Sequence, residues 1–167
     1  MTSNLPIVRQ VSWVSLIPQI IILIALIYIA RLFGFKNYEY IGLIFYIIFI
    51  YVLRFQIPKD HRRGVKLYKK HNFSEAIPFF QNSYDFFKKH LWIDKFRFIT
   101  LMFSSKISYT EMALLNMAFC HGQIGNGKKS KEIYEQVLKE FPNSEIAKAS
   151  LRMFASAEEN TEPHAQQ

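Results

Sequence analysis

Cysteine is nearly absent from this chain of 167 residues, since Cys120 is the only one. A single thiol excludes an intrachain disulfide framework and a metal site built from several cysteines. The spacings HxxxH and HExxH, which bind zinc on helices, do not occur among the five histidines. The sequence therefore predicts no metal and no cofactor.

A recognisable catalytic constellation is also missing. Cys120 and His121 are neighbours, but consecutive side chains on a helix do not face each other, so they cannot form a nucleophile–base pair. The glycines of HGQIGNG (121–127) fit a turn between helices, because no strand precedes them as in a phosphate-binding loop. No serine or acid stands in a nucleophile setting. We therefore expect Cys120 to be a packing residue and the chain not to be an enzyme.

Acidic residues are scarce relative to basic ones, with 13 against 21 lysines and arginines, and the formal net charge is +8. A balance of this kind is typical of proteins that meet an anionic partner, either nucleic acid or the inner face of a membrane. The basic residues crowd beside an apolar segment, where a nucleic-acid duplex is hard to admit. We therefore expect contact with a membrane and no nucleic-acid partner.

Charge is missing from two long stretches. Residues 11–30 are twenty uncharged positions, and at about 1.5 Å per residue a helix of this length spans a bilayer core of about 30 Å. Residues 40–57 form a second, mainly apolar run, whose only charged residue is Arg54, and the side chain of Arg54 can reach the interface. The alternatives are a cleaved signal peptide and a buried core helix, but the first run has no small-residue cleavage pattern and the remaining chain is too small to cover both runs. The sequence predicts a transmembrane hairpin over 1–57, with spans at about 11–30 and 40–57.

Basic residues follow the second apolar run. Residues 54–70 contain seven lysines and arginines against one acid, Asp60, whereas the basic residues of the connection 31–39 are Arg31 and Lys36 alone. The positive-inside rule then places both termini in the cytoplasm. Five of the basic side chains are candidates for contact with anionic lipid head groups: Arg54, Lys59, Arg62, Arg63 and Lys66.

The stretch 111–144 has 34 residues, the length of one helix–turn–helix solenoid repeat. Its apolar, small, turn and proline residues fall where a tetratricopeptide repeat has them: Leu114, Met117, Ala118, Gly125, Ser130, Tyr134 and Pro142. The stretch 58–87 fits the same pattern with Gly64, Phe73, Ala76, Phe80 and Ser83. We expect a close contact between helices at Gly64 and Ala76. Both stretches resemble tetratricopeptide repeats, which are scaffolds for binding proteins.

The segments RRGVKLYKK, HLWIDKFRF, SYTEMALLNMAFC and QIGNGKKSKEIYE resemble an uncharacterised group of small bacterial membrane proteins with two N-terminal spans and degenerate tetratricopeptide repeats. The resemblance implies an all-α fold, in which the hairpin precedes a small repeat solenoid with a C-terminal capping helix, and a place in the bacterial inner membrane. It implies no activity. The boundaries that we expect are a repeat domain at 58–157, with repeats at 58–87 and 111–144, an insertion at 88–110 and a cap at 145–157, and then a disordered tail at 158–167.

The insertion 88–110 has aromatic residues at helical spacing, which predicts an amphipathic helix. We expect its aromatic side chains to be core residues rather than part of a partner pocket: Trp92, Phe96, Phe98 and Phe103. In the pocket alternative, Trp92 joins polar residues near a concave surface of the repeats that holds a peptide or helix: Asn72, Asn116, Gln123 and Lys128.

These observations lead us to expect a membrane-anchored interaction module or scaffold, whose repeat domain binds a protein or peptide at the cytoplasmic face. The identity of that partner has no signature in the sequence. The alternative is a small structural subunit of a membrane complex, in which the transmembrane hairpin itself carries the specificity.

Overall fold

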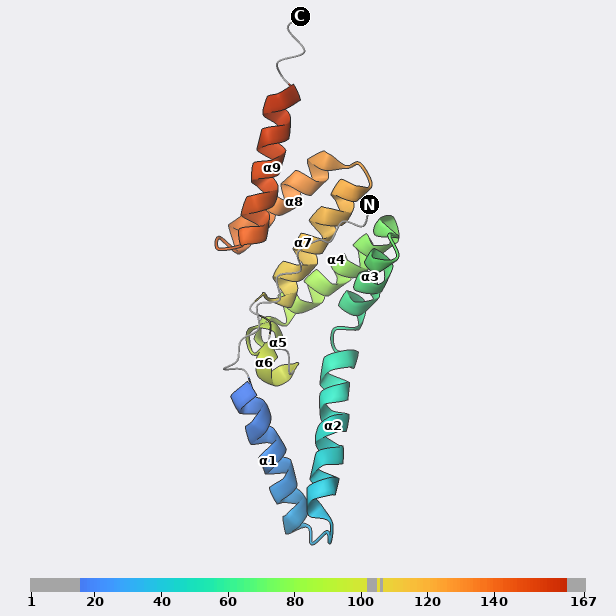
Figure 1. Ribbon diagram of the computed structural model, residues 1–167, viewed down its shortest axis with the longest axis vertical. Helices are drawn as coiled ribbons and strands as arrows, with labels where there is room; N and C mark the ends of the chain where they lie inside the picture. Colours follow the sequence, from blue (N-terminus) through green and yellow to red (C-terminus); the bar gives the residue numbers. More distant parts are fainter. Residues whose placement is uncertain (1–15, 102–104, 106, 162–167) are drawn as a thin grey trace, which may run out of the picture. The chain divides into compact units, whose positions relative to one another are not determined.

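The computed structural model describes residues 16–101, 105 and 107–161, and the regular elements in this part of the chain are all helices (Figure 1). The all-α prediction is therefore confirmed for the described residues. The helices are α1 (Leu16–Leu32), α2 (Tyr38–Gln56), α3 (Lys59–Lys69), α4 (Phe73–Lys89), α5 (Leu91–Lys95), α6 (Arg97–Thr100), α7 (Tyr109–Gln123), α8 (Gly127–Glu140) and α9 (Glu145–Thr161).

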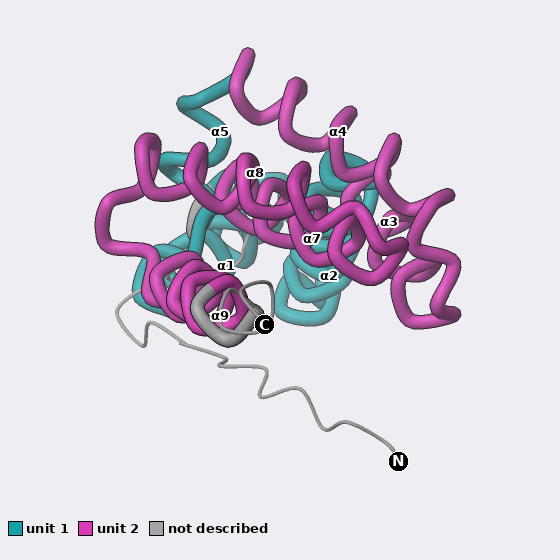
Figure 2. The backbone as a smooth tube through the Cα atoms, turned by 90° about the horizontal axis from the view of Figure 1, so that it is seen from above, with its two compact units in different colours: residues 1–59, 90–108 teal, residues 60–89, 109–167 magenta. Residues whose placement is uncertain are grey.

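The chain divides into two compact units (Figure 2). The first comprises residues 1–59 and 90–108, and the second comprises residues 60–89 and 109–167. The segment that holds α5 and α6 thus belongs with α1 and α2, because α6 packs on α1. The sequence boundaries differ here, since they place the insertion inside the repeat domain. Helical spacing alone predicts a helix, but it does not show against which element that helix packs.

In the first unit, α1 and α2 pack against each other through small residues. The buried positions in these two helices are Ala30 and Gly42. A Cβ atom at Gly42 would lie 2.6 Å from the Cα of Ile27, so the two backbones approach as closely as a missing side chain permits. Large apolar side chains lie outside this contact, and most of them are exposed.

Length and apolar composition would let α2, with 19 residues, cross a membrane. It corresponds to the second predicted span at 40–57. Helix α1 is apolar and has 17 residues as described. The first predicted span, 11–30, overlaps it, but its residues 11–15 lie outside the described part of the chain.

In the second unit, α3 and α4 meet where Gly64 faces the ring of Phe80. A Cβ atom at Gly64 would lie 2.9 Å from that ring, and Ala76 is fully buried. The predicted close contact of helices is confirmed at Gly64, and Ala76 is buried as a contact residue would be. Any side chain at position 64 would push the two helices apart, because aromatic rings in a packed core have little room to move.

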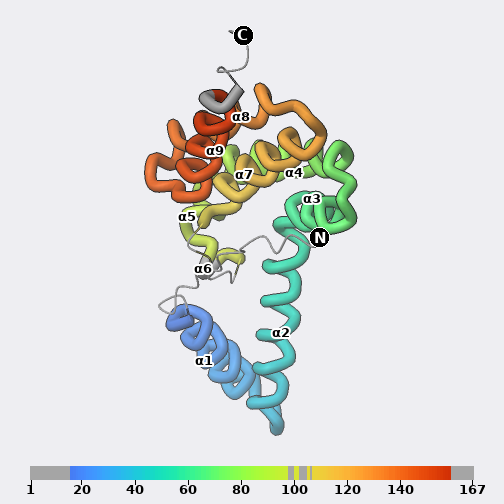
Figure 3. Tube along the Cα trace, turned by 45° about the horizontal axis from the view of Figure 1, so that its top comes forward, coloured from blue at the N-terminus to red at the C-terminus, as the bar shows by residue number. Residues whose placement is uncertain are grey.

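Helix α7 forms the centre of the second unit, since it packs on α4 along one side and on α8 along another (Figure 3). Most of the core cluster lies on these three helices, and α9 adds Ala147. The cluster comprises Ala76, Phe80, Tyr84, Ala113, Leu114, Leu115, Met117, Ala118, Cys120, Ile133, Tyr134, Val137 and Ala147. The predicted packing role of Cys120 is confirmed by its complete burial.

Helix α9 packs on α8, with the rings of Tyr134 and Phe154 6.3 Å apart. It continues to Thr161, so the predicted disordered tail at 158–167 is wrong for residues 158–161. Glu158 lies 2.7 Å from the Nζ atom of Lys131 on α8, and this ion pair favours the extra turn of helix. The remainder of the predicted tail lies outside the described residues.

Two aromatic residues of the insertion are not core residues. Trp92 and Phe96 are 61% and 46% exposed, so the prediction that they are buried is wrong. The side chains of α5 that point inward are those of Ile93 and Asp94. Phe98 and Phe103, the other two predicted core residues, have side chains outside the described part of the structure.

Candidate functional site

One side of α7 is not covered by the core. Met112, Asn116, Phe119 and Gln123 recur at intervals of four, three and four residues, which places them on one face of the helix. The first three are half-buried and Gln123 is exposed. Because most other residues of α7 are buried, this stripe is the continuous part of the helix that can meet a partner.

Three aromatic rings from three helices come together at this stripe. The ring of Phe119 lies 5.3 Å from that of Tyr68 on α3 and 6.0 Å from that of Phe73 at the start of α4, and the latter two rings are 5.7 Å apart. All three side chains are half-buried. The exposed ring of His71 packs edge-on against that of Phe73, with the ring centres 5.7 Å apart. We call Tyr68, Phe73 and Phe119 the aromatic cluster.

Three of the residues predicted to line a partner groove lie around the aromatic cluster. Asn72 is exposed and directly precedes Phe73, while Asn116 and Gln123 flank Phe119 on α7. The other two are placed differently. Lys128 is exposed in the first turn of α8, and Trp92 belongs to the first unit.

Tyr68 and Phe119 were not among the predicted groove residues. Helix α7 has apolar residues on most of its sides, so its sequence does not show which of these residues the core covers. The available signal was the spacing of Asn116 and Gln123 around Phe119, since two amides on an otherwise apolar helix indicate a face that meets water.

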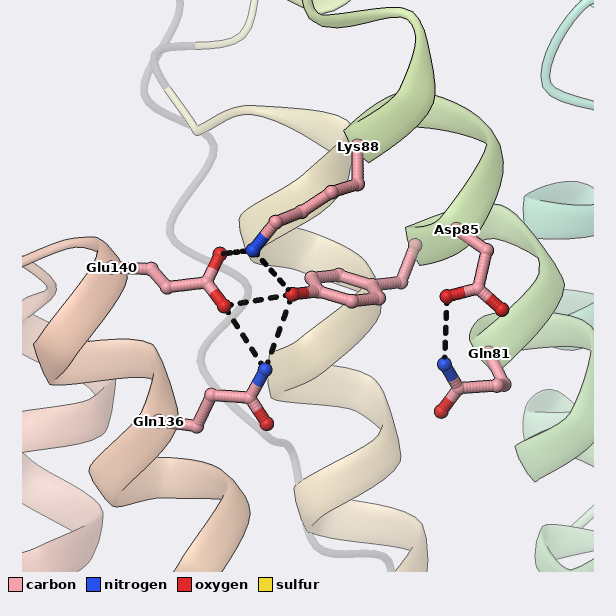
Figure 4. Close-up of polar contacts among 6 residues, drawn as sticks. Gln81, Asp85, Lys88, Gln136 and Glu140 are labelled. Atoms are coloured by element: carbon pink, nitrogen blue, oxygen red, sulfur yellow. Dashed lines mark hydrogen bonds and ion pairs between the residues drawn. The ribbon is translucent and has the colours of Figure 1, made fainter.

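A polar network joins α4 to α8 elsewhere in the second unit (Figure 4). The Glu140 carboxylate accepts hydrogen bonds from the Tyr84 hydroxyl at 2.7 Å, from Lys88 Nζ at 2.7 Å and from Gln136 Nε2 at 3.0 Å. Lys88 also donates to the Tyr84 hydroxyl at 2.7 Å. Burial opposes ionisation of Glu140, but these three hydrogen bonds outweigh it and hold the pKa of its carboxyl below the ordinary value. The network satisfies its own groups, which indicates a structural role.

The buried histidine of α3 is also structural. Nδ1 of His61 lies 3.2 Å from the Ser83 hydroxyl, and its ring packs edge-on against Phe80 and Tyr109 at 5.6 and 5.1 Å. Burial lowers the pKa of His61 to about 4. The imidazole is therefore neutral near pH 7, and it joins α3, α4 and α7 as a packed polar ring.

Cys120 and His121 do not form a reactive pair. Burial raises the pKa of the Cys120 thiol to about 11, so it is protonated near neutral pH and a poor nucleophile. Burial, and then the charge of Lys129, lower the pKa of His121. Among the described residues, Nδ1 of His121 is buried without a hydrogen-bond partner.

The predicted lipid contacts are exposed in both units. Arg54 and Lys59 belong to the first unit, and Arg62, Arg63 and Lys66 lie on α3 in the second. Arg63 makes an ion pair with Asp60 at 3.7 Å, and an exposed pair of this length contributes little to stability.

Within the described part of the chain, no group of three histidine, cysteine or acidic side chains is arranged to hold a metal ion. Comparison of the chain with protein-family models, with curated proteins and with solved structures gives no match.

Proposed function

We propose that this protein is a membrane-anchored module of tetratricopeptide type, which binds a protein or peptide partner at the cytoplasmic face of a bacterial inner membrane. The observation that carries this proposal is the aromatic cluster of Tyr68, Phe73 and Phe119, which is half-exposed and surrounded by amide side chains. Aromatic side chains with polar neighbours are the usual anchors of protein interfaces, because they give a large contact area and adaptable hydrogen bonds.

The anchoring part of the proposal is supported by the exposure of α1 and α2. Most of the large apolar side chains of both helices are exposed. Exposure of so much apolar surface is unfavourable in water and favourable in lipid. Their contact through Ala30 and Gly42 is the packing that helices use in lipid, where small residues let two backbones approach. We therefore propose that the two helices form a transmembrane hairpin, with the basic residues after α2 on the cytoplasmic side.

The repeat part is supported by two helix pairs with corresponding residues. Helices α3 and α7 are each followed, two positions after their last residue, by a residue with positive φ, which is His71 at 63° and Gly125 at 81°. Each turn has the same two backbone hydrogen bonds, from the positive-φ residue and from the asparagine that follows it, Asn72 or Asn126. This is the Schellman arrangement, which satisfies the last carbonyl groups of a helix.

Buried residues of the two helix pairs have the same separation in the chain as the two turns. His71 and Gly125 are as far apart in the chain as Gly64 and Ala118, which are both buried, and as Ala76 and Ser130. Ala76 and Ser130 are both buried, and the Ser130 hydroxyl donates to the Ala118 carbonyl at 2.7 Å. Two pairs of helices that share turn geometry and core positions are what a tandem repeat requires.

Site-specific photocrosslinking tests the binding site in the full-length chain. A photoreactive residue at Asn116 is expected to form a protein adduct in native membranes, whereas the same residue at Asn82, an exposed amide of α4, is expected to form none. The Asn116 adduct should weaken when Gln123→Ala is added, because Gln123 lies on the same face of α7. Equal adducts at both positions, or none at Asn116, would refute the proposed surface.

A further inference from the structure

Helix α5 and the residue that follows it expose three large apolar side chains, whereas the acid of α5 is buried. Leu91, Trp92 and Phe96 are 60%, 61% and 46% exposed, whereas Ile93 and Asp94 are 8% and 4% exposed. At helical spacing, the three exposed apolar residues and Lys95 fall on one continuous side. A water-facing helix would show the opposite arrangement, with its charge outside and its large apolar groups inside.

The surroundings of α5 indicate what meets this apolar side. Within the first unit, α6 follows α5 directly and packs on α1. Figure 1 shows α6 at the end of α1 that is remote from the α1–α2 turn. Helix α2 ends at this same end of the pair, where it carries Arg54. Helix α5 therefore belongs to the unit whose two long helices expose apolar side chains. It contacts α6, which lies at the end of the pair where α2 carries Arg54.

The charge at the end of α5 suits the boundary between lipid and water. Lys95 is exposed, and its Nζ atom lies 5.9 Å from the centre of the Phe96 ring. Tryptophan favours the membrane interface, and lysine can keep its stem in lipid while its ammonium group meets a phosphate. A basic residue near an anionic surface adds to the attraction between protein and membrane.

We infer that α5, with the Phe96 that follows it, is a third membrane-contacting element, which inserts Leu91, Trp92 and Phe96 into the interfacial layer of the bilayer and directs Lys95 to anionic head groups. This inference rests on the proposed anchoring of the chain by α1 and α2. It gives the insertion between the two repeats a function that neither the repeats nor the spans supply.

Quenching of tryptophan fluorescence by brominated lipids tests the inference in the full-length protein. The chain has two tryptophans, so Trp13→Phe leaves Trp92 as the only tryptophan. In vesicles that contain anionic lipid, Trp92 is expected to be quenched, and more strongly by bromines near the head groups than by bromines deep in the acyl chains. Unquenched emission from Trp92, whether in water or under a protein contact, would overturn the inference.

A second variant separates failure of this inference from failure of the anchoring proposal. With both natural tryptophans changed to phenylalanine, Phe45→Trp places the fluorophore at an exposed position of α2. Deep bromines are expected to quench it. If the fluorophore on α2 is quenched and Trp92 is not, α5 lies outside the bilayer although the span stands. If neither is quenched, the anchoring proposal and the inference both fail.

Discussion

At the scale of single residues, backbone geometry shows a relation between the two helix pairs that side-chain identity hides. The turn after α7 is marked in the sequence by Gly125, which adopts positive φ without strain. The corresponding residue after α3 is His71, which adopts the same conformation at a cost that glycine avoids. The same turn is thus formed by a residue that favours it and by one that does not.

Replacement of Gly125 by alanine is expected to destabilise the second unit by about 1 kcal/mol, because alanine is strained at positive φ although nothing lies within 4 Å of the new Cβ atom. The matched control is Gly127→Ala in the first turn of α8. There the new Cβ atom makes an ordinary contact of 3.8 Å with Phe154, and we expect no loss. The reporter is modification of Cys120, the single, fully buried thiol, during heating of the full-length protein in micelles. Equal labelling midpoints for the two variants would contradict the assigned turn.

At the scale of helices, α4 and α8 are linked by the carboxylate of Glu140, although they are not neighbours in the chain. A carboxyl whose pKa is lowered by folding stabilises the folded state above its ordinary pKa of 4.5. That contribution is lost as the pH falls through the lower pKa of the folded state. Hydrogen bonding to Glu140, and then to Tyr84, raises the pKa of Lys88 above its ordinary value of 10.5. Its contribution to the stability of the folded state is complete below pH 10.5 and is lost as the pH rises through the raised pKa. The network is therefore complete around neutral pH.

Replacement of Glu140 by glutamine is expected to lower stability at pH 7 by about 1 kcal/mol, a modest figure because Lys88 is half-exposed and solvent screens the pair. The difference from the natural protein should disappear in acid, well below pH 4.5. Thermal unfolding followed by circular dichroism measures both effects. Glu132→Gln provides the control, since its pair with Lys129 is exposed on one helix and its removal should cost almost nothing. A pH-independent loss at Glu140 would show that its charge does not stabilise the link.

Much of the helical structure was predictable, because the buried stripes of α4 and α8 recur at helical spacing. The insertion was predictable only as helical. Its aromatic residues indicate an apolar side, but spacing cannot show whether that side faces a core, lipid or a partner. For a related reason, the sequence predicted the amide side chains of the candidate site but not its aromatic rings. Amides such as Asn116 are recognisable as surface residues, whereas the ring of Phe119 resembles the core rings in sequence.

At the scale of the whole molecule, the chain enters the first unit, passes to the second, returns to the first with residues 90–108 and ends in the second. The α5–α6 segment therefore interrupts the second unit in sequence, while α6 packs with α1 in space. Such an arrangement ties the second unit to the first by three chain crossings instead of one.

Replacement of residues 1–57 by an unrelated pair of membrane spans distinguishes the two functions that the sequence allows. If the repeats carry the specificity, the photoreactive residue at Asn116 should capture the same protein in the exchanged chain, because the aromatic cluster and the core of the second unit are unchanged. If the natural spans carry the specificity, as in a structural subunit, capture should be lost. Helix α6 loses its contact with α1 in this variant, so protection of Cys120 from labelling is the necessary control that the second unit remains folded. Lost capture with Cys120 still protected would reject the repeats as the binding element and assign recognition to α1 and α2.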